Sequence, residues 1–259
     1  MPSQKHNQPT PAARTSWDEV AEWYSGMVGE GGHKFHQRLA IPALLDMLAP
    51  QAGEAIIDIG CGPAPLAPFI ADTGAEYVGV DASPRLLDAA LAHHGRDGTF
   101  YLGDARKLWA IRGLVAGTFD GAAFLLSIQD MDPLDEVLRA AAWALRDGGR
   151  VVLLMTHPAF RVPRQSGWGW DEERKLRFRR VDRYLTPLPV PMRGGATRSF
   201  HRPLNEYING LANNGLLTER IAEIPGYDER QAHGQARADN VADREIPLFL
   251  ALRARKLSR

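Results

Sequence analysis

A short apolar segment that ends in an acid and two glycines constrains the fold more than any other stretch of this chain. Residues 55–62 read AIIDIGCG, and a β-branched run that is apolar on both faces is typical of a buried strand in a parallel sheet. Gly60 and Gly62 remove side chains where the backbone must turn sharply and where a ligand approaches. Pro63 and Pro65 then suit a first helical turn. The segment therefore predicts a strand, a ligand-binding turn and the start of a helix.

A second segment, residues 76–81 (EYVGVD), predicts another strand that ends in an acid. Nucleoside-binding α/β folds place a carboxylate about twenty residues after the glycine turn, against the two ribose hydroxyls. Asp81 is a bidentate acceptor of the required kind. Pro65, however, stands where a pyrophosphate-binding fingerprint has its third glycine. This difference, together with the lack of a second-domain catalytic set, disfavours a nicotinamide-dependent oxidoreductase, which stays open as an alternative.

Five short motifs follow one another in this part of the chain. They are DIGCG at 58–62, VDASP at 80–84, LGDA at 102–105, FDGAAFLLS at 119–127 and LRDGGRVVLL at 145–154. In this order and spacing they resemble the motifs of the class I S-adenosylmethionine-dependent methyltransferase family, small-molecule type. Each motif alone is a weak signal, whereas five in register are specific.

The resemblance implies an α/β fold with a Rossmann-like, seven-stranded, mostly parallel sheet, an antiparallel last strand and helices on both faces. It also implies an enzyme that moves a methyl group from S-adenosyl-L-methionine to a small-molecule acceptor, releases S-adenosyl-L-homocysteine and uses no metal. A sulfonium donor is already a good electrophile, so such an enzyme mainly holds donor and nucleophile in line and excludes water.

The resemblance also implies, position by position, which residues bind the methyl donor. The expected donor-binding residues are Tyr24, Asp58, Gly60, Cys61, Gly62, Asp81, Ala82, Asp104, Ala105, Ser127 and Gln129. Among them, the turn residues would shape the donor's amino-acid end, Asp81 would hold the ribose, and Asp104 with Ala105 would reach the adenine. For Tyr24, which would touch the donor's carboxylate, simple packing with the hydroxyl at the rim is an equal alternative.

The N-terminal part divides into a tail and a helical cover. Residues 1–13 are polar and contain proline, which predicts disorder, so we expect one domain over residues 14–259. Within residues 14–53, apolar spacing predicts two helices that lie over the ligand cleft, with a break at the glycines of residues 26–32 and the second helix over 35–48. Three side chains near the break are expected to be solvated: His33, Lys34 and His36.

Composition excludes several function classes. The formal net charge of zero gives no global field for nucleic acid or membrane. The single cysteine, Cys61, excludes an intramolecular disulfide and a cysteine-rich zinc site. No apolar run is long enough to span a bilayer, and the N-terminus lacks the apolar core of a signal peptide. We therefore expect a cytoplasmic protein without a membrane partner.

The helices and strands after the glycine turn follow the expected alternation. Crossover helices are predicted over 64–71 and 84–93, the latter capped by Ser83, and a third strand over 99–102. Further along, residues 134–145 predict a helix and residues 150–155 the fifth strand.

The loop after the fourth predicted strand lies on the edge of the sheet where open α/β folds bind ligands. Ser127, Gln129 and Asp130 are therefore candidates to line the gap between the methyl donor and the acceptor. Asp132, just before the next helix, is expected to be a plain helix cap.

Residues 156–202 form a connection much longer than is usual between a strand and a helix. Eleven basic residues against four acidic ones give this segment a charge of plus seven, and aromatic residues are interleaved. We predict an acceptor-side insertion that acts as a lid. Its expected acceptor contacts, together with one residue before it, are Gln129, Arg161, Trp168, Trp170, Arg183 and Tyr184.

Two alternatives for the insertion stay open. Basic and aromatic residues together also grip nucleic acid through phosphate contacts and stacking, so an RNA methyltransferase or a nucleic-acid-binding protein is a less favoured rival. A solvated helix over residues 171–183 with acid–base pairs is the structural alternative. His157, directly after the fifth strand, is the candidate general base. A histidine that hydrogen-bonds loop backbone is the more favoured reading of that residue.

The C-terminal part is expected to complete the sheet. Residues 204–211 predict an amphipathic helix, and residues 216–224 and 246–252 predict two strands. Between these strands, residues 225–244 are polar and predict a mobile loop. Residues 251–259 resemble a basic tail.

Overall fold

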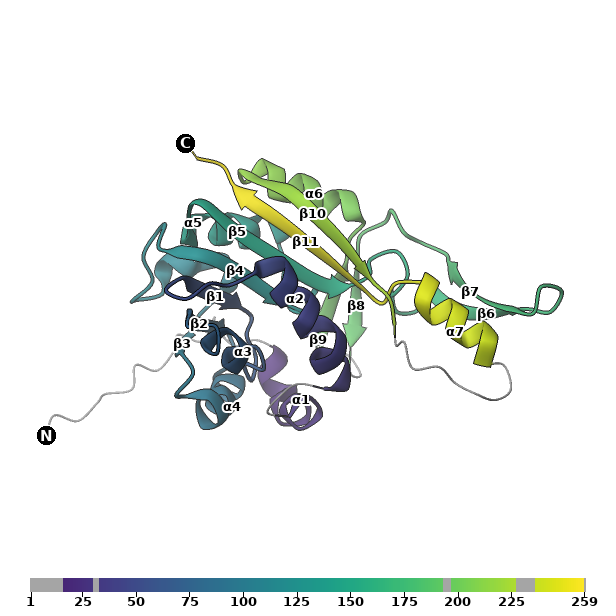
Figure 1. Ribbon diagram of the computed structural model, residues 1–259, viewed down its shortest axis with the longest axis horizontal. Helices are drawn as coiled ribbons and strands as arrows, with labels where there is room; N and C mark the ends of the chain where they lie inside the picture. Colours follow the sequence, from purple (N-terminus) through teal and green to yellow (C-terminus); the bar gives the residue numbers. More distant parts are fainter. Residues whose placement is uncertain (1–15, 30–32, 193–196, 227–235, 259) are drawn as a thin grey trace, which may run out of the picture.

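The computed structural model describes residues 16–29, 33–192, 197–226 and 236–258. Figure 1 shows a central twisted sheet with helices on both faces, and a hairpin with a neighbouring helix that extends beyond one end of the sheet. The tail predicted over residues 1–13 lies outside the described residues, as does the part 227–235 of the predicted C-terminal loop.

The sheet has seven strands in the order β10-β11-β5-β4-β1-β2-β3. The strands are β1 (Ala55–Ile59), β2 (Glu76–Asp81), β3 (Thr99–Leu102), β4 (Phe119–Leu125), β5 (Leu145–Thr156), β10 (Leu216–Ile224) and β11 (Phe249–Lys256). Neighbours pair in parallel except that β11 runs antiparallel to both β5 and β10. This confirms the expected mostly parallel sheet with an antiparallel last strand. The strand order reverses between β1 and β4, and ligands of open α/β sheets bind at such a point.

The apolar run of β1 is explained by a core on each face of the sheet. Ile56 packs into a cluster with helices α2 (Ile41–Leu48), α3 (Ala67–Ala71) and α4 (Pro84–His94). Ile57, its neighbour, packs into a cluster with helices α5 (Leu134–Ala144) and α6 (Leu204–Asn213) on the other face. Both isoleucines are fully buried, because successive residues of a strand point to opposite faces.

The helical cover begins with η2 (Ser16–Val20) and α1 (Ala21–Val28), and continues through η3 (His36–Ala40) into α2. The predicted break at Gly26 is wrong, because α1 runs on to Val28. Gly29 ends the helix with a φ of 65°, a left-handed conformation that glycine adopts without strain.

Local backbone conformation sets where the two helices after the glycine turn begin. The first crossover helix was predicted over 64–71 and is shorter, α3, because Ala64 has a left-handed φ of 59°. The second, α4, is as predicted: the Ser83 hydroxyl accepts a hydrogen bond from Leu86 N (3.3 Å), and Pro84 follows at the first helical position.

The chain after β5 differs most from the predictions. The helix considered over residues 171–183 is wrong: β6 (Ser166–Asp171) and β7 (Leu176–Val181) form an antiparallel hairpin. A second hairpin follows, β8 (Leu188–Met192) and β9 (Thr197–His201). Within the predicted loop 225–244 lies helix α7 (Ala236–Glu245), and the predicted basic tail belongs to β11 as far as Lys256.

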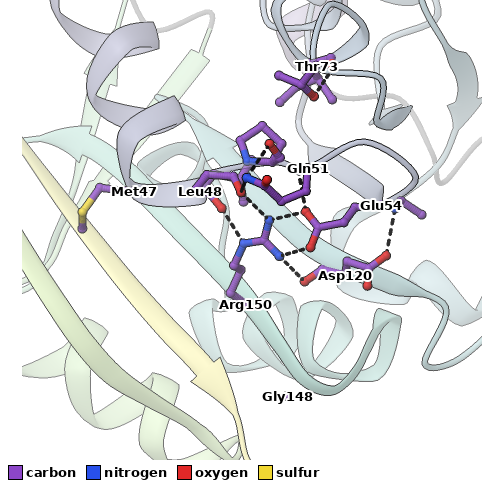
Figure 2. A network of polar contacts seen from close by, with 12 residues as sticks. Met47, Leu48, Gln51, Glu54, Thr73, Asp120, Gly148 and Arg150 are labelled. Atoms are coloured by element: carbon purple, nitrogen blue, oxygen red, sulfur yellow. Dashed lines mark hydrogen bonds and ion pairs between the residues drawn. The ribbon is translucent and has the colours of Figure 1, made fainter.

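A buried arginine joins four segments at the amino end of the parallel strands, as Figure 2 shows. The guanidinium of Arg150 on β5 donates to Leu48 O and to Ala49 O (3.1 Å) at the end of α2. It also forms a bidentate ion pair with Glu54 (2.5 and 2.9 Å) and donates to Asp120 O (3.3 Å) on β4. The edge of the sheet opposite the glycine turn is therefore held by one side chain.

Candidate donor and acceptor site

The turn after β1 has the geometry expected of a ligand-binding turn. Gly60 and Gly62 adopt φ values of +74° and +56°, in the left-handed region that glycine adopts at little cost. Gly60 N donates to Val80 O (2.8 Å) on β2. A Cβ at Gly60 would lie 2.5 Å from Met131 Cε and 2.8 Å from Ser127 Cβ. Gly60 is therefore required both by its φ and by the close approach of the loop after β4.

Asp81, at the end of β2, ties this turn to the next one. Its Oδ2 accepts a hydrogen bond from Gly62 N (2.9 Å) and its Oδ1 from Ser83 N (2.8 Å). Burial raises the pKa of Asp81, while these backbone donors lower it. Each carboxylate oxygen has a second lone pair, so both oxygens keep capacity for a vicinal diol.

Asp58, in β1, is buried beneath the turn. The Tyr77 hydroxyl donates to its Oδ2 (2.8 Å), and its Oδ1 has no hydrogen-bond partner among the described residues. Burial raises the pKa of Asp58 to about 7, against the hydrogen bond from Tyr77, and the negative charge of Asp81 adds to the rise. This environment favours a cationic hydrogen-bond donor close to Asp58.

The other predicted donor residues lie along the same edge of the sheet. Asp104 follows β3 and caps η4 (Ala105–Ala110), but Arg106 already binds its carboxylate, with Nη2 to Oδ2 at 2.7 Å. Ser127 donates to Ile59 O (2.7 Å) and so links the ends of β4 and β1. Burial raises the pKa of the Cys61 thiol, which forms no disulfide and donates to Gly62 O (3.7 Å).

Tyr24 on α1 lies between the glycine turn and a cavity. A Cβ at Gly62 would be 3.5 Å from Tyr24 Cε1, and Trp17 packs edge-on against the Tyr24 ring at 5.1 Å between centroids. Burial, followed by the negative charges of Asp130 and Asp81, raises the pKa of Tyr24. The predicted contact with a donor carboxylate stays a prediction, and the ring is also well packed.

The cavity has a volume of about 320 Å³ and lies between the helical cover, the loop after β4 and the β8–β9 hairpin. Much of its wall is apolar, from the side chains of Trp17, Trp23, Met27, Val190, Met192 and Phe200. Its polar groups include Gln129, Asp130, His157, Arg161, Ser199 and Arg202. Such a mixture of apolar walls and a few polar groups is typical of small-molecule sites.

The predicted acceptor residues divide into two groups. Gln129 and Arg161 line the cavity, whereas Trp168, Trp170, Arg183 and Tyr184 are not among its lining residues. The Trp168 ring lies against the guanidinium groups of Arg177 (4.2 Å), Arg179 (5.0 Å) and Arg161 (5.2 Å). The Tyr184 hydroxyl accepts a hydrogen bond from Leu204 N (2.8 Å) at the start of α6.

His157 lines the cavity, but both of its ring nitrogens have partners. Nδ1 accepts a hydrogen bond from Ala159 N (3.2 Å), which places the proton on Nε2, 3.0 Å from Glu223 Oε1. Burial lowers the pKa of His157, against the effect of Glu223. This geometry leaves no free lone pair for an acceptor's proton and favours the structural reading of His157.

Several cavity residues were not predicted or were placed elsewhere. His36 is buried in the cavity wall, so the expectation of a solvated loop residue is wrong. Asp132 is not a helix cap, because Pro133 occupies that position and the Asp132 carboxylate pairs with Arg202 (2.7 Å). Ser199 reaches the site through the β8–β9 hairpin. No prediction placed a hairpin in residues 188–201, and Pro189 and Pro191 lie within β8 itself.

Known proteins resemble this chain in both sequence and fold. A family model described as a methyltransferase domain matches residues 57–153. A solved S-adenosylmethionine-dependent methyltransferase from Mesorhizobium loti is 28% identical, with a TM-score of 0.68 over 83% of this chain and 96% of that one. The ubiquinone biosynthesis O-methyltransferase of Ralstonia nicotianae is 29% identical over 45% of this chain. The demethylmenaquinone methyltransferase of Tropheryma whipplei is 28% identical over 59%.

The matches span 50% and 63% of the length of those two quinone-pathway relatives. Strand order and the glycine turn tied to Asp81 define an α/β protein with a Rossmann-like sheet. Residues 57–153 match that family model, and the Mesorhizobium structure shares the fold over most of both chains, so the chain contains a methyltransferase domain similar to those of class I S-adenosylmethionine-dependent enzymes.

Two further observations concern metals and membranes. Among the described residues, no group of three or more His, Cys, Asp or Glu side chains is placed to hold a metal ion. No helix in the described part of the chain has the length and apolarity needed to cross a membrane.

Proposed function

We propose that this protein transfers a methyl group from S-adenosylmethionine to a small-molecule acceptor bound in the 320 Å³ cavity. The main support for this proposal is the position of Tyr24. Its Cε1 lies 3.5 Å from where a Cβ of Gly62 would be, and Tyr24 also lines the cavity. The donor turn and the acceptor cavity therefore adjoin each other. When bound, S-adenosylmethionine supplies a methyl group on a positively charged sulfur.

The residues of the turn fit such a donor. The unpartnered Oδ1 of Asp58 suits an ammonium group, and the Asp81 carboxylate suits the two ribose hydroxyls. The space above Gly60 and Gly62 admits no larger residue at Gly60 without a clash. The helical cover, with Trp17 and Tyr24, would exclude water from both ligands.

A small acceptor is favoured over RNA by the positions of the basic residues. Binding of unpaired bases uses free aromatic faces beside a basic groove. Here Trp168 is already in contact with three guanidinium groups, and Arg177 pairs with Asp239 (2.9 Å). The two quinone-pathway relatives named above add support for a small, planar acceptor.

Donor binding tests the proposal directly. We expect the wild-type protein to bind S-adenosylhomocysteine in calorimetry, and Asp81→Ala to weaken that binding by about 1.5–3 kcal/mol, the range for hydrogen bonds to charged groups. Asp88→Ala, which removes an exposed carboxylate on α4, is the control and should leave affinity unchanged. Circular dichroism checks that each variant is folded.

Two results would contradict the proposal. One is binding of a nicotinamide dinucleotide without binding of S-adenosylhomocysteine. The other is an unchanged affinity in a folded Asp81→Ala protein, which would remove Asp81 from the donor site.

A further inference from the structure

One carboxylate in the cavity wall has a hydroxyl partner but no cationic partner among the described residues. Asp130 is the last residue of the short turn η5 (Ile128–Asp130), directly after β4. Its Oδ1 accepts a hydrogen bond from the Ser199 hydroxyl on β9. Among the residues that the structure describes, no cation forms an ion pair with it. Burial raises the pKa of Asp130 to about 7, against the effect of Ser199.

The groups that face Asp130 do not neutralise its charge. Tyr24 approaches from α1 and Tyr207 from α6, and the charge of Asp130 contributes to the raised pKa of both phenols. Arg202 lines the cavity after β9; its Nη2 donates to Met131 O (2.7 Å) and pairs with Asp132, whereas its Nη1 has no hydrogen-bond partner among the described residues. Asp130 therefore differs from Asp132, which has a guanidinium partner.

The imidazole and guanidinium groups elsewhere in the cavity are also committed or uncharged; among them, His201 Nε2 donates to Tyr184 O (2.7 Å). Burial lowers the pKa of His36 to about 4, so that ring is neutral near pH 7. His157 has a partner on each ring nitrogen. Arg161 donates to Pro247 O (3.2 Å) and Ile246 O (3.3 Å) and lies against Trp168. Asp130 is therefore a cavity carboxylate without a cationic partner among the described residues, and it is available to bind a ligand.

The rest of the wall indicates the shape of that ligand. Aromatic and thioether side chains from the cover and the β8–β9 hairpin surround the space, which favours a flat, largely apolar molecule. A flat molecule with a polar hydrogen would suit both the apolar wall and the Asp130 carboxylate. Because Asp130 follows β4 on the carboxyl edge of the sheet, beside the donor turn, that hydrogen would lie near the atom that receives the methyl group.

Resting on the proposed methyl transfer, we propose that Asp130 binds the O–H or ring N–H of a planar aromatic acceptor and takes its proton. The acceptor's oxygen or nitrogen forms the new bond to the methyl carbon, while the carbon–sulfur bond of the donor breaks and leaves its electron pair on sulfur. The proton passes to the Asp130 carboxylate and then to water. The products are the methylated acceptor and S-adenosylhomocysteine.

A matched pair of probes tests this assignment without knowledge of the natural acceptor. 2-Naphthol carries the hydroxyl, and 2-methoxynaphthalene has a similar shape without the polar hydrogen. Binding of each to the full chain, in the presence of S-adenosylhomocysteine, is followed by fluorescence titration from pH 5.5 to 8.5. Wild type, Asp130→Asn and Asp130→Leu are compared, with Asp135→Asn, an exposed carboxylate on α5, as the control.

We expect wild type and Asp135→Asn to bind 2-naphthol about tenfold more tightly than 2-methoxynaphthalene at pH 8.5, as a hydrogen bond to a charged group predicts. This preference should grow as the pH rises through 7, because only the ionised carboxylate is the strong acceptor. Asp130→Asn should make it independent of pH, and Asp130→Leu should abolish it. A role in packing alone would not produce this pH profile.

Three outcomes would overturn the assignment: an equal preference in wild type and Asp130→Leu, a pH profile that survives in Asp130→Asn, or failure of both probes to bind. Binding of S-adenosylhomocysteine, measured separately, tests the methyl-donor proposal. Its loss in wild type would reject the proposed function, whereas its retention with any of the three outcomes rejects the role of Asp130 alone.

Discussion

Asp130 and Asp132 are two residues apart in the loop after β4, yet their surroundings give them different chemistry. Asp132 pairs with Arg202 and is half exposed, so its charge is compensated. Asp130 is turned toward the cavity with a hydroxyl partner, and burial raises its pKa to about 7. A carboxylate with a pKa near the working pH is suited to proton transfer, whereas a paired one is suited to holding structure.

Asp58 gives the ligand-free protein a measurable pH dependence of stability. Burial raises its pKa from 3.8 to about 7, so between these values the folded state holds a proton that the unfolded state lacks. The contribution of Asp58 to the free energy of unfolding of the protein therefore falls as the pH rises from 4 to 7. We expect Asp58→Asn to gain stability relative to wild type over this range, by up to about 4 kcal/mol at 1.36 kcal/mol per pKa unit.

Urea unfolding of both proteins at pH 5 and pH 8 measures this difference. The comparison removes the opposite contribution of His36, whose pKa is lowered in the folded state, because both proteins contain it. If the free energies of unfolding of wild type and Asp58→Asn differ by the same amount at pH 5 and at pH 8, the prediction is contradicted. Asp58 is then already ionised in the folded state at pH 5.

The positions of the residues in the glycine turn were predictable from sequence because they depend on local spacing. Gly60 and Gly62 must follow β1, and Asp81 must end β2, so spacing along the chain fixes their positions. The acceptor cavity is different. His36, Ser199 and Arg202 come from segments far apart in the chain, and no local pattern shows that these segments meet.

A carboxylate of η2, the first element of the cover, hydrogen-bonds to the start of α4. Asp18 Oδ1 accepts hydrogen bonds from Ser83 Oγ (2.9 Å) and Arg85 N (3.2 Å) at the start of α4. We expect Asp18→Ala to loosen η2 and α1, and to lower their local opening free energy in amide hydrogen exchange by about 1–2 kcal/mol, since Asp18 is partly exposed. Because Tyr24 lies on α1, affinity for S-adenosylhomocysteine should fall as well.

Glu19→Ala is the matched control, since Glu19 is the next residue and is exposed. It should leave both exchange and affinity unchanged. Equal exchange in α1 of wild type and Asp18→Ala would mean that apolar packing of Trp17 and Val20 holds the cover by itself.

The β6–β7 hairpin shows why one element was misjudged from sequence. Residues 171–183 contain acids and bases at helical spacing, which supports a helix in isolation. Residues 176–181 (LRFRRV) begin with strand-like alternation. The Trp168 ring on β6 contacts guanidinium groups of the opposing strand β7 and of Arg161, and these contacts favour the hairpin. Tertiary packing thus overrides the local ion-pair pattern.

At the scale of the whole molecule, the Arg150 network holds the end of the sheet away from the site (Figure 2). We expect Arg150→Ala to lower the free energy of unfolding by about 3–5 kcal/mol, because it leaves Glu54 and two helix-end carbonyls without their buried partner. Thermal unfolding followed by circular dichroism measures the loss. Below the melting temperature, affinity for S-adenosylhomocysteine should stay unchanged.

Arg146→Ala is the control for this prediction. Arg146 also forms an ion pair on the same edge, with Asp120 (2.5 Å), but its side chain is 51% exposed. Its removal should cost less than about 1 kcal/mol. Similar losses in the two variants would show that burial of Arg150 adds nothing to an ordinary surface ion pair.

The position of β11 in the sheet has a consequence for the order in which the chain is made. Because β11 lies between β10 and β5, strand β10 leaves the ribosome before its sheet neighbour exists. Until β11 arrives, the hydrogen-bonding groups of β10 are unpaired, and Leu217 and Ile221 are half exposed even in the finished fold. An unpaired apolar strand is open to pairing with other chains. During synthesis, β10 is therefore open to such pairing until β11 has been made.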